Sequence, residues 1–200
     1  RAASGQELGL KTFHRSRAIT ASLGIRDIRA VATAAVREAD DGPDFKARAE
    51  RILGVPIKIL SGADEGRMSA LGVAAGFVKS SGLIADLGGT SMEIRPVQGK
   101  AKGESFLLGP LARAGDEELS FSKRLKLINK TLSKSQFKVD AKKGQLFVVG
   151  GAWRNVAAVH MMLRHYPLRV AHGYRMTADD VEDVIEAAEL AQSDKQTRDQ

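Results

Sequence analysis

Short apolar runs alternate with helical segments along most of this chain, and that alternation limits its fold more than any other feature. The runs 28–33, 57–60 and 145–149 have the length and composition of strands, and a segment with helical spacing follows each of them. Between residues 83 and 108 the pattern changes to three extended runs separated by glycine-containing turns, which predicts a meander. The sequence therefore predicts an α/β fold with a mixed sheet and flanking helices.

Glycine positions and apolar spacing indicate where the helices end and which faces they bury. Gly24 and Gly54 are suited to end helices predicted over 15–23 and 45–53, since glycine adopts the left-handed cap conformation. Other helices are predicted over about 117–132, through 156–163, and after a capping box formed by Thr177 and Asp180. A further helix has an apolar stripe and many small residues, which predicts close packing; the stripe is Met68, Leu71, Ala75 and Val78.

Composition excludes several classes of protein. The chain has no cysteine, so disulfide scaffolds, thiolate metal sites and cysteine nucleophiles are excluded. No stretch approaches the roughly 18 apolar residues of a membrane span, so no membrane partner is predicted. A net charge of +7 favours a polyanionic partner, and the most one-sided charge run is 123–143, with eight basic residues and one acid. An aromatic content of 5% argues against nucleic acid, because single strands bind by stacking on aromatic rings.

The strongest local signal for chemistry is the segment 86–91 at the end of a predicted buried strand. Gly88 and Gly89 permit a tight turn whose N–H groups approach an oxyanion, and the hydroxyls of Thr90 and Ser91 add donors. Asp86 offers a carboxylate for a cation. These are the components of a phosphate and Mg²⁺ site, although a plain hairpin explains the same six residues.

Three further segments place polar groups after predicted strands. Gly150 and Gly151 precede a helix, which directs N–H groups toward a ligand at the carboxyl edge of the sheet. Arg37 is suited to pair with phosphate and Glu38 to accept a proton from water, or the two form an exposed ion pair. In the segment 61–67, Glu65 is suited to orient water or Mg²⁺, or it simply complements the dipole of a first helical turn. Each segment alone is weak, and the set of four favours phosphate chemistry. The four histidines form no zinc motif with a third ligand and are predicted to be structural or surface residues rather than catalytic ones.

The same segments, in the same order, resemble the exopolyphosphatase and guanosine pentaphosphate phosphohydrolase family. Residues 33–39 look like its Thr-x-x-x-Arg-Glu-Ala segment, 61–67 are similar to Ser-Gly-x-Glu-Glu-Ala-Arg, and 86–93 resemble Asp-Ile-Gly-Gly-Gly-Ser-Thr-Glu. The segments 150–152, 166–168 and 172–174 fit later patterns of the family. Three positions depart from these patterns: Asp64 replaces the first Glu, Gly66 replaces Ala, and Thr90 replaces the third Gly.

The resemblance implies an actin-like, ribonuclease H-like superfold with two lobes. The family's first phosphate loop, Asp-x-Gly-Ser-Asn, has no counterpart in residues 1–23, so we expect a fragment of a longer enzyme. Residues 1–60 would then end the first lobe, 61–190 would form the second, and 191–200 would be a polar tail. The resemblance is also compatible with a homodimer.

The activity implied by the resemblance is a phosphoanhydride hydrolase that releases orthophosphate from polyphosphate or guanosine pentaphosphate. The family's pattern implies Glu38 as general base and Mg²⁺ held by Asp86 and Glu65. It also implies that Arg37 offsets charge on the transferred phosphoryl group. The terminal phosphate would lie on residues Gly88, Gly89, Thr90, Ser91, Gly150 and Gly151. The alternatives are a sugar-kinase-like phosphotransferase that uses ATP and a non-catalytic sensor of alarmones or polyphosphate. We expect a cytoplasmic protein.

Overall fold

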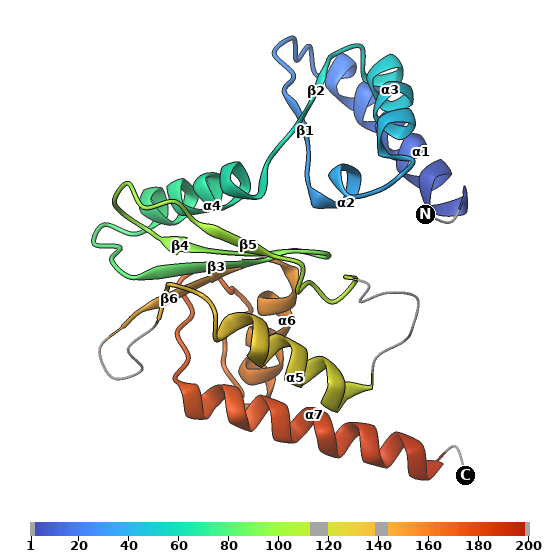
Figure 1. The fold of residues 1–200 in the computed structure, drawn as a ribbon. Coiled ribbons are helices and arrows are strands. Elements are labelled where there is room, and N and C mark those ends of the chain that lie inside the picture. The colour runs from blue at the N-terminus through green and yellow to red at the C-terminus, as the bar shows by residue number, and fades with distance from the viewer. Residues whose placement is uncertain (1–2, 113–119, 139–143, 199–200) are drawn as a thin grey trace.

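The structure is a computed structural model that describes residues 3–112, 120–138 and 144–198. Its strands form two sheets (Figure 1). The smaller sheet pairs β1 (Ala30–Ala32) with β2 (Ile57–Ile59) in parallel. The larger sheet has the order β5-β4-β3-β6. It contains β3 (Leu83–Leu87), β4 (Met92–Pro96), β5 (Glu104–Phe106) and β6 (Leu146–Val149).

The larger sheet confirms the predicted mixed topology. Strands β3, β4 and β5 form the antiparallel meander, whereas β6 pairs with β3 in parallel. Helix α4 (Gly62–Gly76) covers one face of this sheet, and α6 (Gly151–Leu163) lies on the other (Figure 1). Helix α7 (Ala178–Arg198) packs against α6. It extends through most of the segment 191–200 that the sequence analysis set apart as a tail.

The smaller sheet is covered by two helices on one face. These are α1 (Ala3–Ser22) and α3 (Gly42–Leu53), and a short helix α2 (Ala34–Arg37) follows β1. Phe45, Ala49, Leu53 and Ile57 form a core cluster here together with Leu10. A second cluster lies between α4 and the larger sheet, with Ile84 fully buried at its centre. Only residues 60 and 61 separate β2 from α4.

The predicted cap glycines end their helices. At the end of α1, Gly24 has a φ of +66°, Ile25 N–H donates to the Thr20 carbonyl, and Gly24 N–H donates to the Ala21 carbonyl. These two bonds form a Schellman motif. Gly54 ends α3 with a φ of +72°. Helix α1 begins well before the predicted residue 15, and β1 is shorter than the predicted run 28–33.

The predicted apolar stripe of α4 is wrong. Met68, Leu71 and Val78 are 50%, 52% and 102% exposed. The helix instead buries its smallest residues, Gly66 and Ala70, together with Val73. A Cβ at Gly62 would lie 2.5 Å from the Ser105 hydroxyl oxygen. A larger residue at this position would therefore clash, and glycine lets the helix lie closer to the sheet. The prediction of close packing through small residues is therefore confirmed, and the burial of the stripe is not.

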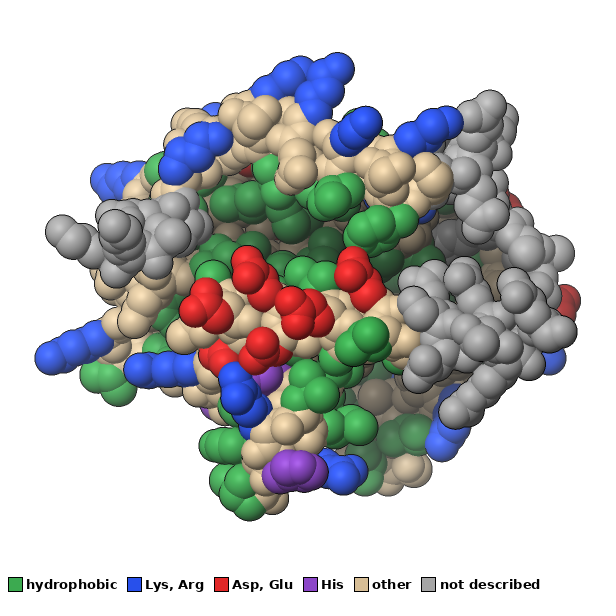
Figure 2. Space-filling view, turned by 90° about the horizontal axis from the view of Figure 1, so that it is seen from below, with side chains coloured by type: hydrophobic (Ala, Val, Ile, Leu, Met, Phe, Trp, Pro, Cys, Tyr) green, Lys and Arg blue, Asp and Glu red, His purple; other side chains and the backbone are tan. Residues whose placement is uncertain are grey.

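Helix α5 (Phe121–Leu132) lies beside the larger sheet with none of its residues buried. Its predicted start near 117 falls outside the described residues. Leu125, Ile128 and Leu132 share one face of this helix, as predicted. Seen from below, the molecule has a hollow lined by hydrophobic side chains beside a group of acidic side chains (Figure 2).

Candidate active site

Three of the predicted catalytic side chains meet where the small sheet approaches α4. Arg37 ends α2, Glu38 is the C-cap of that helix, and Glu65 lies in the first turn of α4. The Arg37 Nη1 atom donates to Glu65 Oε1 at 2.7 Å and to the Leu60 carbonyl at 2.5 Å, and its Nε donates to Glu38 Oε1 at 2.8 Å. One guanidinium therefore joins two carboxylates that are 27 residues apart in the sequence.

The surroundings of Arg37 keep it charged. Burial of the guanidinium acts to lower its pKa, but the hydrogen bonds and charges of Glu65 and Glu38 outweigh burial, so the pKa is raised. The three side chains differ in exposure: 25% for Arg37, 13% for Glu65 and 50% for Glu38. Glu65 is the more enclosed of the two carboxylates.

The two acids of the segment 61–67 have different tasks. Ser61 is the N-cap of α4 and accepts a hydrogen bond from Asp64 N–H at 3.1 Å, while its hydroxyl donates to Asp64 Oδ2 at 2.8 Å. These bonds lower the pKa of Asp64. Asp64 is therefore held in the helix cap, which leaves Glu65 as the acid of this pair that reaches Arg37.

A second group of acids lies on the larger sheet. Asp86 of β3 and Glu93 of β4 are direct partners in the antiparallel register, so both side chains project from the same face. The Ser69 hydroxyl of α4 donates to Asp86 Oδ2, and the Ser105 hydroxyl donates to Glu93 Oε1 at 2.8 Å. Asp86 is a site residue predicted from the sequence, whereas Glu93 and Ser69 are not among the predicted residues. Two-residue alternation along β4 would have placed Glu93 on the same face as Asp86.

Glu93 connects the two groups of acids. It is 3% exposed, and this burial is the largest influence that raises its pKa. Hydrogen bonds from Ser91 and Ser105 lower the pKa, while the nearby charges of Glu65 and Asp86 raise it further. Glu65, Glu93 and Asp86 are thus close enough to repel one another, and the Arg37 group is continuous with the Asp86 group.

The predicted glycine turns lie at the carboxyl edge of β3 and β6. Gly150 has a φ of +116°, and a Cβ there would lie 2.2 Å from the Leu87 carbonyl oxygen. No side chain caps α6 at this position, so its first N–H groups are available to a ligand. In the other turn, Gly88 and Gly89 are exposed and Thr90 is half-buried. Ser91 is 3% exposed and its hydroxyl bonds Glu93, so it is less accessible than its neighbours.

The segment after β5 braces the turn 88–91. Gly109 N–H donates to the Thr90 carbonyl at 3.1 Å, and Leu111 N–H donates to the Gly89 carbonyl at 2.7 Å. A Cβ at Gly109 would lie 2.5 Å from the backbone of Gly89. The Gly88 N–H closes the turn on the Ser91 carbonyl at 2.9 Å, and the carbonyls of Gly89 and Thr90 accept from Leu111 and Gly109. The N–H groups of Gly89 and Thr90 are therefore the ones that the turn offers to an anion.

The histidines are away from this site. His160 is buried, with Nδ1 2.8 Å from the Tyr174 hydroxyl and Nε2 3.2 Å from Asp180 Oδ1. Among the described residues, His160, Asp180 and Asp183 are the group of three whose ligand atoms lie within 4.8 Å of one another. Arg164 Nη2 already occupies this group, at 3.3 Å from Asp180 and 2.9 Å from Asp183. The group therefore has its own cation.

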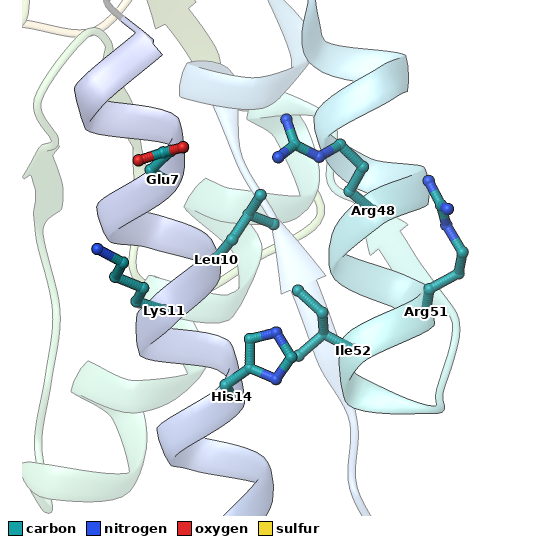
Figure 3. A pocket seen from close by; sticks show the side chains of 7 residues that line it. All are labelled: Glu7, Leu10, Lys11, His14, Arg48, Arg51 and Ile52. Atoms are coloured by element: carbon teal, nitrogen blue, oxygen red, sulfur yellow. The ribbon is translucent and has the colours of Figure 1, made fainter.

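A hollow of about 420 Å³ lies between α1 and α3 (Figure 3). Arg48 and His14 point toward the gap between the two helices, over an apolar floor formed by Leu10 and Ile52. The predicted site residues do not line it. Its lining residues are Glu7, Leu10, Lys11, His14, Arg48, Arg51 and Ile52.

In the described part of the chain, no helix combines the length and the apolar character needed to cross a membrane.

Comparison with known proteins identifies relatives over nearly the whole chain. The model of the Ppx/GppA phosphatase family matches residues 6–199. Exopolyphosphatase 1 of Mycobacterium leprae is 40% identical over 78 residues, which are 38% of this chain and 23% of that protein. The chain thus matches less than a quarter of this relative.

Solved structures show the same fold. A crystal structure of an exopolyphosphatase-like protein has a TM-score of 0.77 at 24% identity, covering 93% of this chain and 64% of that one. An exopolyphosphatase from Cytophaga hutchinsonii has a TM-score of 0.64 at 16% identity, with 84% and 57% covered. The Ppx/GppA family member of Aquifex aeolicus has a TM-score of 0.58 at 20% identity, with 83% and 56% covered. The predicted actin-like α/β fold is confirmed by these neighbours.

Proposed function

The chain belongs to the Ppx/GppA phosphatase family, and we propose that its site hydrolyses the terminal phosphoanhydride bond of inorganic polyphosphate or guanosine pentaphosphate. The observation that carries this proposal is the continuous group of Arg37, Glu65, Glu93 and Asp86 beside the Gly88 turn. It combines proton acceptors, a guanidinium and exposed backbone donors, which are the groups that phosphoryl transfer to water requires.

In the proposed reaction, the oxygen of a water molecule attacks the terminal phosphorus. The bond from that phosphorus to the bridging oxygen breaks, and the electron pair leaves with the shortened chain. A carboxylate takes the proton of the attacking water. Arg37 offsets charge on the transferred phosphoryl group, and the N–H groups at Gly89, Thr90, Gly150 and Gly151 bind the phosphate oxygens. The Gly88 N–H holds the turn closed by donating to the Ser91 carbonyl. Ser91 supports the turn through Glu93.

The carboxylate that takes the proton is Glu38 in the prediction from sequence, and the contacts of the structure favour Glu65. Glu65 is electrostatically coupled to Glu93, which lies beside Asp86, whereas Glu38 contacts only Arg37 in this group. Glu65 is also the more buried carboxylate, and burial strengthens its interaction with a reacting water. The assignment of Glu38 stays a prediction that variants can test.

The acidic group suits the predicted Mg²⁺. Its donors are carboxylate oxygens, which Mg²⁺ prefers. Burial is the main cause of the raised pKa of Glu93, and the charges of Glu65 and Asp86 add to it, so a cation near these acids would offset their repulsion. Asp86 is the proposed ligand if Glu65 takes the proton, and Glu65 is the second ligand if Glu38 takes it. Ser69 orients the Asp86 carboxylate. When bound, Mg²⁺ would neutralise charge on the phosphate oxygens.

Phosphate release by the full-length protein tests the proposal. We expect Mg²⁺-dependent release of orthophosphate from polyphosphate, from guanosine pentaphosphate, or from both, with water as the acceptor. Binding of both compounds without release would identify a sensor. ADP formation that depends on an added acceptor would identify an ATP phosphotransferase, and either result would contradict the proposal. The division at residue 60, the cytoplasmic location and the homodimer remain predictions outside this test.

A further inference from the structure

Helix α5 has an unusual distribution of charge. Its basic residues are Lys123, Arg124, Lys126 and Lys130, and its twelve residues include no acid. Lys134 continues the last turn, since its N–H donates to the Thr131 carbonyl at 3.2 Å. Exposed helices usually mix the two signs of charge, so a helix of one sign repels itself unless an anion is nearby.

Four of these lysines form one row. Lys123, Lys126, Lys130 and Lys134 follow one another at intervals of three, four and four residues, which places them on one face of a helix. At a rise of 1.5 Å per residue the row is about 16 Å long. We call Lys123, Lys126, Lys130 and Lys134 the α5 lysine row.

The α5 lysine row makes no ion pair with the rest of the described chain. All four side chains are exposed, and none makes an ion pair within the described residues. The neighbouring basic residues do have tasks: Lys138 Nζ donates to the Ser133 carbonyl at 3.1 Å, and Arg124 donates to the Pro110 carbonyl at 3.4 Å. The row is therefore free to bind an external anion.

Among the described residues, no acidic side chain is paired with this charge. Phe121, Leu125, Ile128 and Leu132 form the opposite face of α5. In Figure 2, acidic side chains lie along one side of a hollow lined by hydrophobic side chains, and lysine and arginine side chains lie along its opposite side. Arg164 pairs with two of the acids of α7, Asp180 and Asp183, whereas no acid of α7 forms an ion pair with the α5 lysine row in the described part of the chain.

The α5 lysine row begins beside the Gly88 turn. Arg124, in the first turn of α5, contacts the carbonyl of Pro110, and the adjacent Leu111 N–H donates to the Gly89 carbonyl at 2.7 Å. Lys123 is the next residue to Arg124. A chain of phosphates whose last unit lies at the turn would therefore meet the first lysine of the row soon after leaving the site.

We propose that the α5 lysine row binds the internal phosphates of a long inorganic polyphosphate whose terminal phosphate lies at the Gly88 turn. This inference rests on the proposed function for the position of the terminal phosphate. Lysine ammonium groups are compact point charges that suit a uniform polymer of phosphates. The row has no aromatic side chain on its face for a base to stack on, which favours polyphosphate over single-stranded nucleic acid.

The test compares two double variants of the full-length protein with the same change in charge. K126E/K130E reverses the centre of the row. K100E/K102E is the matched control, because Lys100 and Lys102 are exposed on the β4–β5 connection, at the opposite end of β4 from the Gly88 turn. Binding of long-chain polyphosphate and of tripolyphosphate is measured without Mg²⁺, so that no turnover is required, over a series of salt concentrations.

We expect K126E/K130E to weaken binding of the long chain on the order of tenfold or more and to reduce its dependence on salt. Tripolyphosphate binding should be unchanged, since three phosphates do not reach the centre of the row. The control should retain long-chain affinity. Equal losses in the two variants, or an equal loss for tripolyphosphate, would overturn the inference.

Two other results separate this inference from its premise. If the wild type binds long polyphosphate through the row but releases no phosphate from it, the proposed function fails and the binding surface stands. If single-stranded RNA binds equally well and loses affinity equally in K126E/K130E, the row is a nucleic-acid surface and the inference is wrong.

Discussion

Arg37 donates hydrogen bonds to Glu38 and Glu65 at the same time, so replacing either carboxylate changes the charge and the hydrogen bonding around the other. The variants E38Q and E65Q keep an oxygen that accepts from Arg37 and remove the ability to take a proton. We expect E65Q to lower kcat about 10²-fold to 10⁴-fold, because Glu65 is the acid coupled to the Asp86 group, and E38Q to lower it less. Single-turnover phosphate release measures both. A larger loss in E38Q would restore Glu38 as the base.

Glu93 is a buried carboxylate whose ionisation costs stability. Burial first, and then Asp86 and Glu65, raise its pKa above the ordinary value of 4.5. A raised pKa means that the folded protein binds the proton more tightly than the unfolded chain. The stability that protonated Glu93 contributes to the folded protein is fully present below pH 4.5 and is lost as pH rises through the raised pKa. E93Q should therefore have a higher Tm than the wild type at pH 7 to 8, and the difference should shrink toward pH 4.

Thermal melts over that pH range test the Glu93 prediction. The control is E182Q, at an exposed position of α7, which should shift Tm little at any pH. A wild-type protein that melts above E93Q at pH 8 would show that the ionised Glu93 is stabilised by its surroundings, contrary to the prediction.

At the scale of elements, the contact between the β3 end and the α6 start depends on Gly150. An alanine there has two costs: the positive φ and a Cβ 2.2 Å from the Leu87 carbonyl oxygen. Gly54 also has a positive φ, +72°, but no atom lies within 4 Å of its Cβ position. G54A should therefore cost about 1 kcal/mol, and G150A at least about 2 kcal/mol more. Denaturant unfolding gives both values. Equal losses would mean that the backbone relaxes at Gly150.

The capping box of α7 fixes the start of that helix. Asp180 N–H donates to Thr177 Oγ1, while the Thr177 N–H and hydroxyl both donate to Asp180 Oδ2 at 2.8 Å. These bonds, aided by the charges of His160 and Arg164, lower the pKa of Asp180 to about 2 from 3.8. The stability that they contribute is present above pH 3.8 and is lost as pH falls toward 2.

Removal of the Thr177 hydroxyl tests the capping box. T177V should lower stability by about 1 kcal/mol at pH 7, because the helix loses its cap. Its stability should also fall less than that of the wild type between pH 4 and 2. T131V is the control, since Thr131 bonds only the Leu127 carbonyl within α5. A pH profile of T177V parallel to the wild type would show that Asp180 does not depend on Thr177.

At the scale of the whole molecule, the sequence was sufficient for the order of elements. The strand β3 matches its predicted bounds, because a short run that is apolar except for Asp86 lies between Gly82 and Gly88. The buried face of α4 was not predictable, because hydrophobicity alone assigns Met68 to the core and gives no weight to how closely Gly62 lets the helix approach. The pairing of Arg37 with Glu65 was equally hidden, since it depends on how β2 leads into α4. The order of the motifs predicts that Arg37 and Glu65 belong to one site, and the tertiary structure shows that their side chains are in contact.

Buried side chains are unevenly distributed among the elements of the molecule. The strand β3 is bonded to strands on both sides and contains Ile84, which is fully buried, whereas α5 buries no residue. Local stability should therefore be highest at β3 and lowest at α5.

Hydrogen exchange followed by mass spectrometry measures this ranking. Amides of β3 should exchange slowest, because they open only when the larger sheet unfolds, and amides of α5 should exchange among the fastest helical amides. Helix α3 should lie between them, since Ala49 and Leu53 anchor it in the smaller core cluster. Addition of long-chain polyphosphate should slow exchange in α5 and leave β3 unchanged, because the lysine row contributes its charge only when the polyanion is present. Protection of α5 equal to that of β3 without ligand would show that the apolar face of α5 is already covered in solution.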